Sequence, residues 1–181
     1  MPRFVVLLRG VNVGKGNRVP MADFKAMLQG LGYEDVVTLL NSGNAVFTSS
    51  GRFPTKHTQK IATALAESIG VNAAVVVKSS AGFASAVAAN PIPVPEQDHS
   101  KFLVAFANDP ATLKGLETLQ ALVQPPERLV IGQEAAYLYC AAGILESKVC
   151  AAMFGKVGKS VTTRNWATTL KLLSLSGAGA A

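Results

Sequence analysis

Three stretches of the chain combine glycine, asparagine and basic residues in patterns that suit anion binding. The first is RGVNVGKGNRVPM, residues 9–21, which follows an apolar run and precedes a helical pattern. Backbone N–H groups at a strand-to-helix junction, together with the positive end of the helix dipole, bind phosphate or carboxylate groups. A glycine-rich turn that only reverses the chain is the alternative interpretation, because glycine adopts positive φ without steric cost.

The first stretch matches neither of the common nucleotide-binding loops. A P-loop has four residues between its first glycine and a Gly-Lys-Ser/Thr triplet. Here three residues separate Gly10 from Gly14, and Gly16 stands where the hydroxyl residue belongs. A dinucleotide-binding fingerprint requires a third glycine at the position of Val19. An anion bound by this stretch would therefore be held by a loop of another kind.

The other two stretches each have a structural and a functional interpretation. NSGN, residues 41–44, is typical of a tight hairpin turn, but its two asparagines can instead present amides to a ligand. In TTRNW, residues 162–166, Asn165 suits a helix N-cap and Trp166 suits a buried anchor. A buried guanidinium needs paired acceptors. Arg164 therefore predicts a bidentate contact, either with a bound anion or with an internal Asp or Glu.

We predict that these stretches form one ligand site between two domains. The predicted ligand-binding residues are Arg9, Gly10, Asn12, Gly14, Lys15, Asn41, Ser42, Asn44, Arg164 and Asn165. The net charge of the chain is +6, and neither residues 1–22 nor residues 147–181 contain an acidic side chain. Such a charge distribution favours an anionic partner. Ordinary solvated lysines are the alternative explanation for Lys156, Lys159 and Lys171.

No pattern in the sequence predicts a cofactor, a metal site or a catalytic centre. His57 and His99 lie far apart, and neither has a cysteine or carboxylate at metal-ligand spacing. Neither histidine stands beside a nucleophile and an acid, and no two carboxylates have the spacing of a general acid and base. Cys140 and Cys150 lie in a strand-like and a helix-like segment, which predicts buried thiols without a disulfide in a reducing compartment.

The composition predicts a folded, soluble, cytoplasmic protein. Of the 181 residues, 49% are hydrophobic and 15% are charged, which supplies a core and argues against disorder. The N-terminal FVVLL is too short for the core of a signal peptide. No apolar run approaches the roughly 18 residues of a membrane-spanning helix, so no membrane association is expected.

The predicted order of elements occurs twice. Both halves follow β-α-β-β-α-β-α, and the proline-rich NPIPVPEQDHS separates them. This order fits an α+β fold of two tandem ferredoxin-like (alpha-beta plait) units with mostly antiparallel sheets. We predict domains at residues 1–92 and 93–181, the second with a C-terminal helix. Within the second, one helix is expected over residues 109–123, with Asp109 as its cap and Pro110 in its first turn.

The three stretches together resemble the motifs of a bacterial family, domain of unknown function 1697. The resemblance rests on LLRGVNVGKGNRVPM, NSGNAVF and TTRNWATTLKL, and it extends from the first predicted strand to the last predicted helix. It implies two tandem alpha-beta plait domains and brings no established activity. The matching positions are Arg9, Gly10, Asn12, Gly14, Pro20, Ser42, Gly43, Asn44, Thr163, Arg164, Asn165 and Thr168. Lys15, Gly16 and Asn17 approximate a variable part of the first motif.

The sequence favours binding of a small anionic ligand, phosphorylated or carboxylate, and leaves other functions open. Binding to a nucleic-acid phosphate backbone fits the basic balance, although only Phe4 and Phe47 are candidates for base stacking on the central strands. A regulatory module resembling tandem amino-acid-binding plaits is a third function. An enzyme acting on a phosphorylated metabolite is a fourth, and it needs a base or nucleophile that the sequence does not reveal. The oligomeric state is not predicted.

Overall fold

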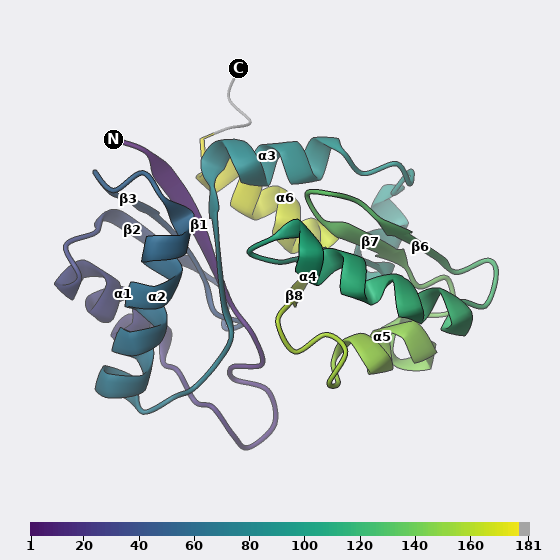
Figure 1. Ribbon diagram of the computed structural model, residues 1–181, viewed down its shortest axis with the longest axis horizontal. Coiled ribbons are helices and arrows are strands. Elements are labelled where there is room, and N and C mark those ends of the chain that lie inside the picture. Colours follow the sequence, from purple (N-terminus) through teal and green to yellow (C-terminus); the bar gives the residue numbers. More distant parts are fainter. Residues whose placement is uncertain (178–181) are drawn as a thin grey trace. The chain divides into compact units, whose positions relative to one another are not determined.

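The computed structural model describes residues 1–177 and divides the chain into two units (Figure 1). The N-terminal unit comprises Met1–Ala84 together with the chain from Leu172 onward, and the C-terminal unit comprises Ser85–Lys171. Each unit contains one four-stranded antiparallel sheet with helices. The predicted α+β class with two sheet-containing units is confirmed. The ferredoxin-like plait and the linear division after residue 92 stay predictions.

The N-terminal unit follows the order strand, helix, two strands, helix, strand, helix. Its elements are β1 (Arg3–Leu8), α1 (Met21–Gly30), β2 (Glu34–Leu39), β3 (Asn44–Thr48), α2 (Pro54–Ala64), a π-helical turn (Leu65–Ile69), β4 (Val75–Ser79) and α3 (Ser80–Ala88), whose last residues belong to the C-terminal unit. The strand order is β2-β3-β1-β4, and all neighbouring strands are antiparallel. The strand β1 is therefore central, and the loop that follows it leaves from the middle of the sheet.

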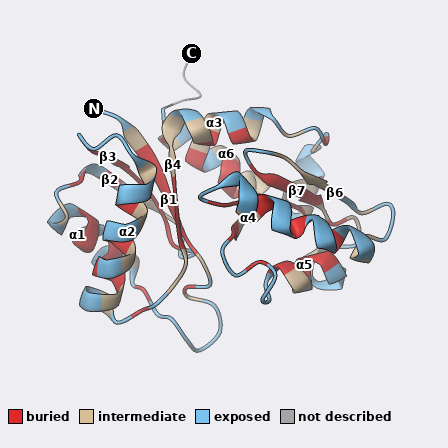
Figure 2. Ribbon diagram, viewed as in Figure 1, coloured by how far each residue is buried: buried red, intermediate tan, exposed pale blue. Residues whose placement is uncertain are grey.

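The apolar sequence of β1 explains its central place. Every residue from Phe4 to Leu8 is buried, and large and β-branched apolar side chains favour a strand that is covered on both faces. Alternate residues of β1 pack against apolar residues of α1 and α2 that recur at helical spacing. The core residues from these three elements are Phe4, Val6, Leu8, Phe24, Met27, Leu28, Ile61 and Ala64. Figure 2 shows this burial along the strands and on the sheet-facing sides of the helices.

The C-terminal unit repeats the same order of strands with shorter helices. Its elements are a 3₁₀ segment (Glu96–Lys101), β5 (Phe102–Phe106), α4 (Pro110–Lys114), a 3₁₀ segment (Gly115–Leu122), β6 (Arg128–Ile131), β7 (Ala136–Tyr139), a 3₁₀ turn (Ile144–Glu146), α5 (Lys148–Met153), β8 (Thr162–Asn165) and α6 (Trp166–Leu175), whose last residues belong to the N-terminal unit. The strand order is β6-β7-β5-β8, again antiparallel throughout.

The helix expected over residues 109–123 changes type part of the way along. Its start agrees with the prediction, because Asp109 Oδ1 accepts the Thr112 N–H at 2.7 Å. The α-helix ends at Lys114 and continues as a 3₁₀ segment. Glycine at position 115 favours the change, because glycine is a weak α-helix former. The buried Leu116 and Leu119 are three residues apart, which places them on one face of a 3₁₀ helix.

None of the helices within residues 1–177 is long and apolar enough to cross a membrane.

Candidate functional site

The side chain of Asn12 holds together the loop between β1 and α1. Its Nδ2 donates to the carbonyl oxygen of Val19 at 2.8 Å, and its Oδ1 accepts the Val19 N–H at 2.9 Å. The same Nδ2 donates to the carbonyl oxygen of Asn41 at 2.7 Å, in the turn between β2 and β3. The Asn12 backbone N–H donates to the Asn17 carbonyl at 3.0 Å. The first two predicted stretches are thus brought together within the N-terminal unit.

The conformation of this loop accounts for its glycine and asparagine content. Gly10, Asn12 and Gly14, at every second position, have φ of 63°, 57° and 62°. Glycine adopts this left-handed region freely, and asparagine tolerates it better than most residues. Residues 13–18 are all exposed, so the tip of the loop lies in solvent. Its local hydrogen bonds fix the loop without covering the tip.

The charges of the loop are positive. Lys15 and Arg18 are exposed, and the Arg18 guanidinium donates to the Gly14 carbonyl at 2.8 Å. Arg9 is half-buried, and this burial lowers the pKa of its guanidinium. Because no acidic residue occurs before Asp23, nothing within the stretch offsets these charges. The loop therefore combines a fixed backbone with an unbalanced positive charge.

A shallow depression adjoins the end of the loop. It has a volume of about 460 Å³, and its lining residues include Arg18, Pro20, Asp23 and Ser68. Arg18 and Asp23, which carry opposite charges, both line it. The potential in this depression is consequently mixed, unlike that at Lys15.

The turn between β2 and β3 is the predicted hairpin. Hydrogen bonds to residues of the N-terminal unit hold it in place. Asn44 is fully buried, and its Nδ2 donates to the Leu39 carbonyl at 2.9 Å and to Ser42 Oγ at 2.8 Å. The Gly43 carbonyl accepts the Leu8 N–H at 2.8 Å. Asn44 therefore serves the turn, whereas Asn41 and Ser42 are exposed.

The third predicted stretch lies in the C-terminal unit. Arg164 in β8 is 7% exposed, and its Nη1 donates to Thr162 Oγ1 and to the Thr163 carbonyl, both at 2.7 Å. Burial lowers the pKa of Arg164 to about 10. Asn165 is the N-cap of α6, because its Oδ1 accepts the Thr168 N–H at 2.9 Å. Trp166 packs edge-on against Phe102, with 5.4 Å between ring centroids.

The predicted site residues fall into two groups by what their side chains do. The exposed positions are Gly10, Gly14, Lys15, Asn41 and Ser42. Residues with an internal hydrogen-bonding role are Asn12, Asn44 and Asn165. Arg9 and Arg164 carry charges that burial destabilises to different degrees. All but Arg164 and Asn165 lie in the N-terminal unit.

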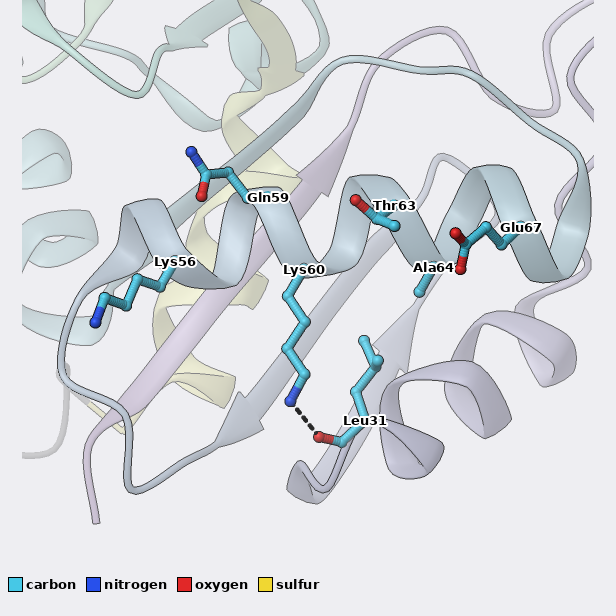
Figure 3. A pocket seen from close by; sticks show the side chains of 7 residues that line it. All are labelled: Leu31, Lys56, Gln59, Lys60, Thr63, Ala64 and Glu67. Atoms are coloured by element: carbon cyan, nitrogen blue, oxygen red, sulfur yellow. Dashed lines mark hydrogen bonds between the residues drawn. The ribbon is translucent and has the colours of Figure 1, made fainter.

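Sequence reasoning missed a polar depression along α2. Its volume is about 430 Å³, and Figure 3 shows its lining, which includes Lys56, Gln59, Lys60, Thr63 and Glu67. The Lys60 ammonium donates to the Leu31 carbonyl at 2.7 Å. In the sequence, these polar residues recur at helical spacing. The same pattern occurs on any solvated helix face, so it does not by itself indicate a site. None of the predicted site residues lines this depression.

His57 has a structural role in the N-terminal unit. Its ring packs edge-on against Phe4, with 4.5 Å between centroids. A carbonyl only accepts, so the 3.0 Å contact with the Gly51 oxygen places the proton on Nε2. The neutral Nδ1 then accepts the Tyr33 hydroxyl at 2.9 Å. Within residues 1–177, no group of three or more His, Cys, Asp or Glu side chains is placed to hold a metal ion.

These features define a class of α+β protein with two four-stranded antiparallel sheets and a basic, internally braced loop after the first strand. The chain belongs to the family described as "Protein of unknown function (DUF1697)", whose sequence model matches residues 1–137. Its fold is similar to that of the conserved bacterial protein SP0830 from Streptococcus pneumoniae. That match has 22% identity and a TM-score of 0.78, and it covers 97% of this chain and 98% of the other. A comparison with curated proteins found no match.

Proposed function

We propose that the protein binds a small anionic ligand, phosphorylated or carboxylate, at the loop between β1 and α1. The observation that supports this most is the combination at residues 10–18 of an internally braced backbone and an exposed, unbalanced positive charge. A loop that is fixed before binding loses less conformational entropy when the ligand arrives. The hydrogen bonds of Asn12 therefore favour a ligand-binding role for the loop over a role that only connects β1 to α1.

The backbone of the loop supports the choice of an anion. Left-handed residues stand at every second position of the loop, and left-handed residues occur in the backbone concavities whose N–H groups bind anions. Concavities of this kind bind phosphate and carboxylate oxygens. Lys15 would add a charge-assisted hydrogen bond, and Asn41 and Ser42 would offer neutral donors from the adjoining turn.

Arg164 is the second proposed contact. Its guanidinium is buried, and the contacts to Thr162 and Thr163 are with neutral oxygens. Burial disfavours the charged form, so the pKa is lowered, yet at about 10 it leaves the group charged at neutral pH. A contact of this guanidinium with a phosphate or carboxylate of the ligand would be charge-assisted.

The alternative of nucleic-acid binding receives less support. Phe4 and Phe47, the aromatic residues considered for base stacking, are fully buried. They stack on each other, with 5.5 Å between ring centroids, in the core of the N-terminal unit. A sheet surface with stacking aromatics is the usual RNA-binding device of plait folds. Nucleic-acid binding without base stacking would rest on contacts with backbone phosphates, and such binding weakens as the salt concentration rises.

A thermal-shift titration tests the proposal. The probes are inorganic phosphate, pyrophosphate, nucleotides, dicarboxylates and a short RNA, each at low and moderate salt. A ligand at about a hundred times its dissociation constant stabilises the folded protein by roughly 2.7 kcal/mol. In a protein of this size each kcal/mol raises the melting temperature by roughly 2–4 °C. We expect a shift with one small anion that persists at moderate salt.

Matched variants locate the site. Lys15→Ala should weaken binding at least about tenfold, the loss expected for one charge-assisted hydrogen bond. Lys25→Ala, an equal charge change at an exposed position of α1, should leave affinity unchanged. Arg164→Lys keeps the charge and removes the planar fork. A double-mutant cycle between Lys15→Ala and Arg164→Lys then tells whether one ligand engages both residues. Equal affinity in Lys15→Ala and Lys25→Ala would contradict the proposed loop site.

A further inference from the structure

The loop between α5 and β8 carries two glycines at Gly-x-x-Gly spacing. It comprises residues 154–160, FGKVGKS, in the C-terminal unit (Figure 1). Gly155 and Gly158 enclose Lys156 and Val157, and Lys159 follows directly. KH domains use a Gly-x-x-Gly loop to clamp the backbone of single-stranded RNA. Two glycines alone do not define a site, so the structure of the loop decides what they mean.

Hydrogen bonds and close packing fix this loop. The Lys159 N–H donates to the Lys156 carbonyl at 3.3 Å, and the Val161 N–H donates to the Gly158 carbonyl at 3.0 Å. Gly158 is buried, and an added Cβ would overlap with the carbonyl of Met153, so only glycine fits there. The loop therefore holds one conformation around its second glycine before any partner arrives.

The fixed loop exposes an aromatic, an aliphatic and two basic side chains. Phe154 is 53% exposed and Val157 is 49% exposed, and both Lys156 and Lys159 are exposed. No acidic residue follows Glu146 in the sequence, so nothing along the loop offsets the two charges. Proteins that bind single strands combine basic groups for the phosphates with aromatic side chains on which bases stack.

Phe154 is the kind of aromatic residue that the two sheets do not offer. Of the eight phenylalanines, only Phe53 and Phe154 are exposed. The ammonium of Lys56 lies over the ring of Phe53, 5.7 Å from its centroid. Phe154 instead stands two residues before Lys156, in the loop that carries the glycine pair. The aromatic residue and the phosphate-binding charges are thus combined in one short segment.

We propose that residues 154–160 bind single-stranded nucleic acid, with Lys156 and Lys159 on backbone phosphates and Phe154 stacked on a base. A single strand fits better than a duplex, because its bases are open to stacking. An anionic membrane would also attract the lysines, but membrane-bound segments present a continuous apolar face, whereas Lys156 separates Phe154 from Val157 here. The site lies in the C-terminal unit and is independent of anion binding at the loop after β1.

Fluorescence anisotropy with the full chain tests the proposal. The probes are a short fluorescein-labelled oligouridylate, an oligothymidylate of the same length and a duplex of that length, each over a series of salt concentrations. We expect either single strand to bind more tightly than the duplex, and the tighter of the two identifies the nucleic acid. We also expect the affinity to fall as the salt concentration rises, because phosphate contacts release counterions.

Two pairs of variants separate the phosphate contacts from the base contact. Replacing Lys156 and Lys159 together by alanine should make the slope of log affinity against log salt shallower by about 1.4, since each phosphate contact to a single strand contributes about 0.7. The matched control replaces Lys25 and Lys114, which are exposed on α1 and α4, and should keep the slope.

Phe154→Ala should weaken single-strand binding at least about fivefold at every salt concentration, the loss expected for one stacked base, and leave the slope unchanged. Phe154→Tyr keeps an aromatic ring and should bind like the wild type. Phe53→Ala, the matched control, removes the other exposed phenylalanine and should leave the affinity unchanged.

Three results would overturn the proposal. The first is wild-type protein that binds neither single strand, and the second is equal affinity in Phe154→Ala and Phe53→Ala. The third is flotation with phosphatidylserine vesicles that Phe154→Ala abolishes, in a protein that does not bind single strands, because the partner is then a membrane. Circular dichroism checks that each variant folds, and if Phe154→Ala does not, the salt slope of the double lysine variant still decides.

Discussion

At the scale of single residues, the asparagines of the motifs prove to be parts of the scaffold. Asn12 uses both ends of its amide to close one loop and to hold the next turn. Asn44 is buried and uses its amide within the hairpin. Leaving a buried amide without hydrogen-bond partners would cost about 1–3 kcal/mol of folding free energy. The structure of the two loops therefore depends on asparagine at these positions. The neighbouring residues Lys15, Asn41 and Ser42 are exposed.

Gly43 is the glycine that the N-terminal unit can least replace. Its φ is +82°, and an added Cβ would lie 2.7 Å from both Leu8 Cβ and Val11 Cγ2. Gly43→Ala should destabilise the protein by at least about 2 kcal/mol, because a left-handed alanine alone costs roughly 1–2 kcal/mol. Denaturant unfolding followed by circular dichroism measures the loss.

The matched control for that change is Gly30→Ala. Gly30 lies at the end of α1, where an added Cβ meets open space. Alanine there should be neutral or stabilising by up to about 1 kcal/mol, because glycine weakens helices. Equal unfolding midpoints for the two variants would argue against the close packing of the turn on β1.

At the scale of elements, the starts of helices follow their capping residues. Asp109 caps α4, and Asn165 caps α6, as their side-chain types predict. The apolar pattern of residues 109–123 predicts one α-helix, but the segment is α-helical only to Lys114 and 3₁₀-helical from Gly115 to Leu122. A spacing of three residues between leucines fits either helix type, and Gly115 lowers the cost of leaving the α form.

Asn165 allows the capping role to be separated from ligand binding. Asn165→Ala removes the acceptor of the Thr168 N–H and should cost about 1 kcal/mol. Asn165→Asp keeps an acceptor and should retain most of the stability. Thermal unfolding of both variants measures the difference. If Asn165→Ala melts like the wild type but loses the anion-induced shift, the side chain serves the ligand and not the helix.

At the scale of the whole molecule, two buried tyrosines make the fold sensitive to alkali. Burial raises the pKa of Tyr33, in the N-terminal unit, to about 12, and the pKa of Tyr137, in the C-terminal unit, to about 12 as well, with a smaller effect of Glu134 on the latter. The folded state therefore holds these protons more tightly than the unfolded state. Stability is complete below about pH 10 and falls as the pH rises toward 12.

The size of this loss can be tested by removing the titrating groups. A rise of about two pKa units in one tyrosine corresponds to roughly 2.7 kcal/mol. Tyr33→Phe and Tyr137→Phe should each flatten the alkaline fall in melting temperature, and the double variant should flatten it most. Each also loses a hydroxyl bond, to His57 and to the Ala86 carbonyl, so melting at neutral pH should drop somewhat. An unchanged alkaline fall in the double variant would contradict the assignment.

The sequence by itself determined the features that arise from local chemistry. The apolar FVVLL made β1 a buried strand, NSG made a hairpin, and Asp109 and Asn165 marked helix starts. The repeated order of elements led to two antiparallel sheets. These inferences succeed because strand burial, turn conformation and capping depend on residues within a few positions of one another.

The tertiary structure alone decided which distant groups meet. The amide of Asn12 reaches the carbonyl of Asn41, and Cys140 and Cys150 belong to one buried cluster. Phe4 and Phe47 turn inward and stack, so neither can stack on a base. Residues 172–177 group with the N-terminal unit, although they follow the C-terminal unit along the chain. Such contacts depend on strand register and on the three-dimensional path of the backbone, which residue types and spacings along the chain do not specify.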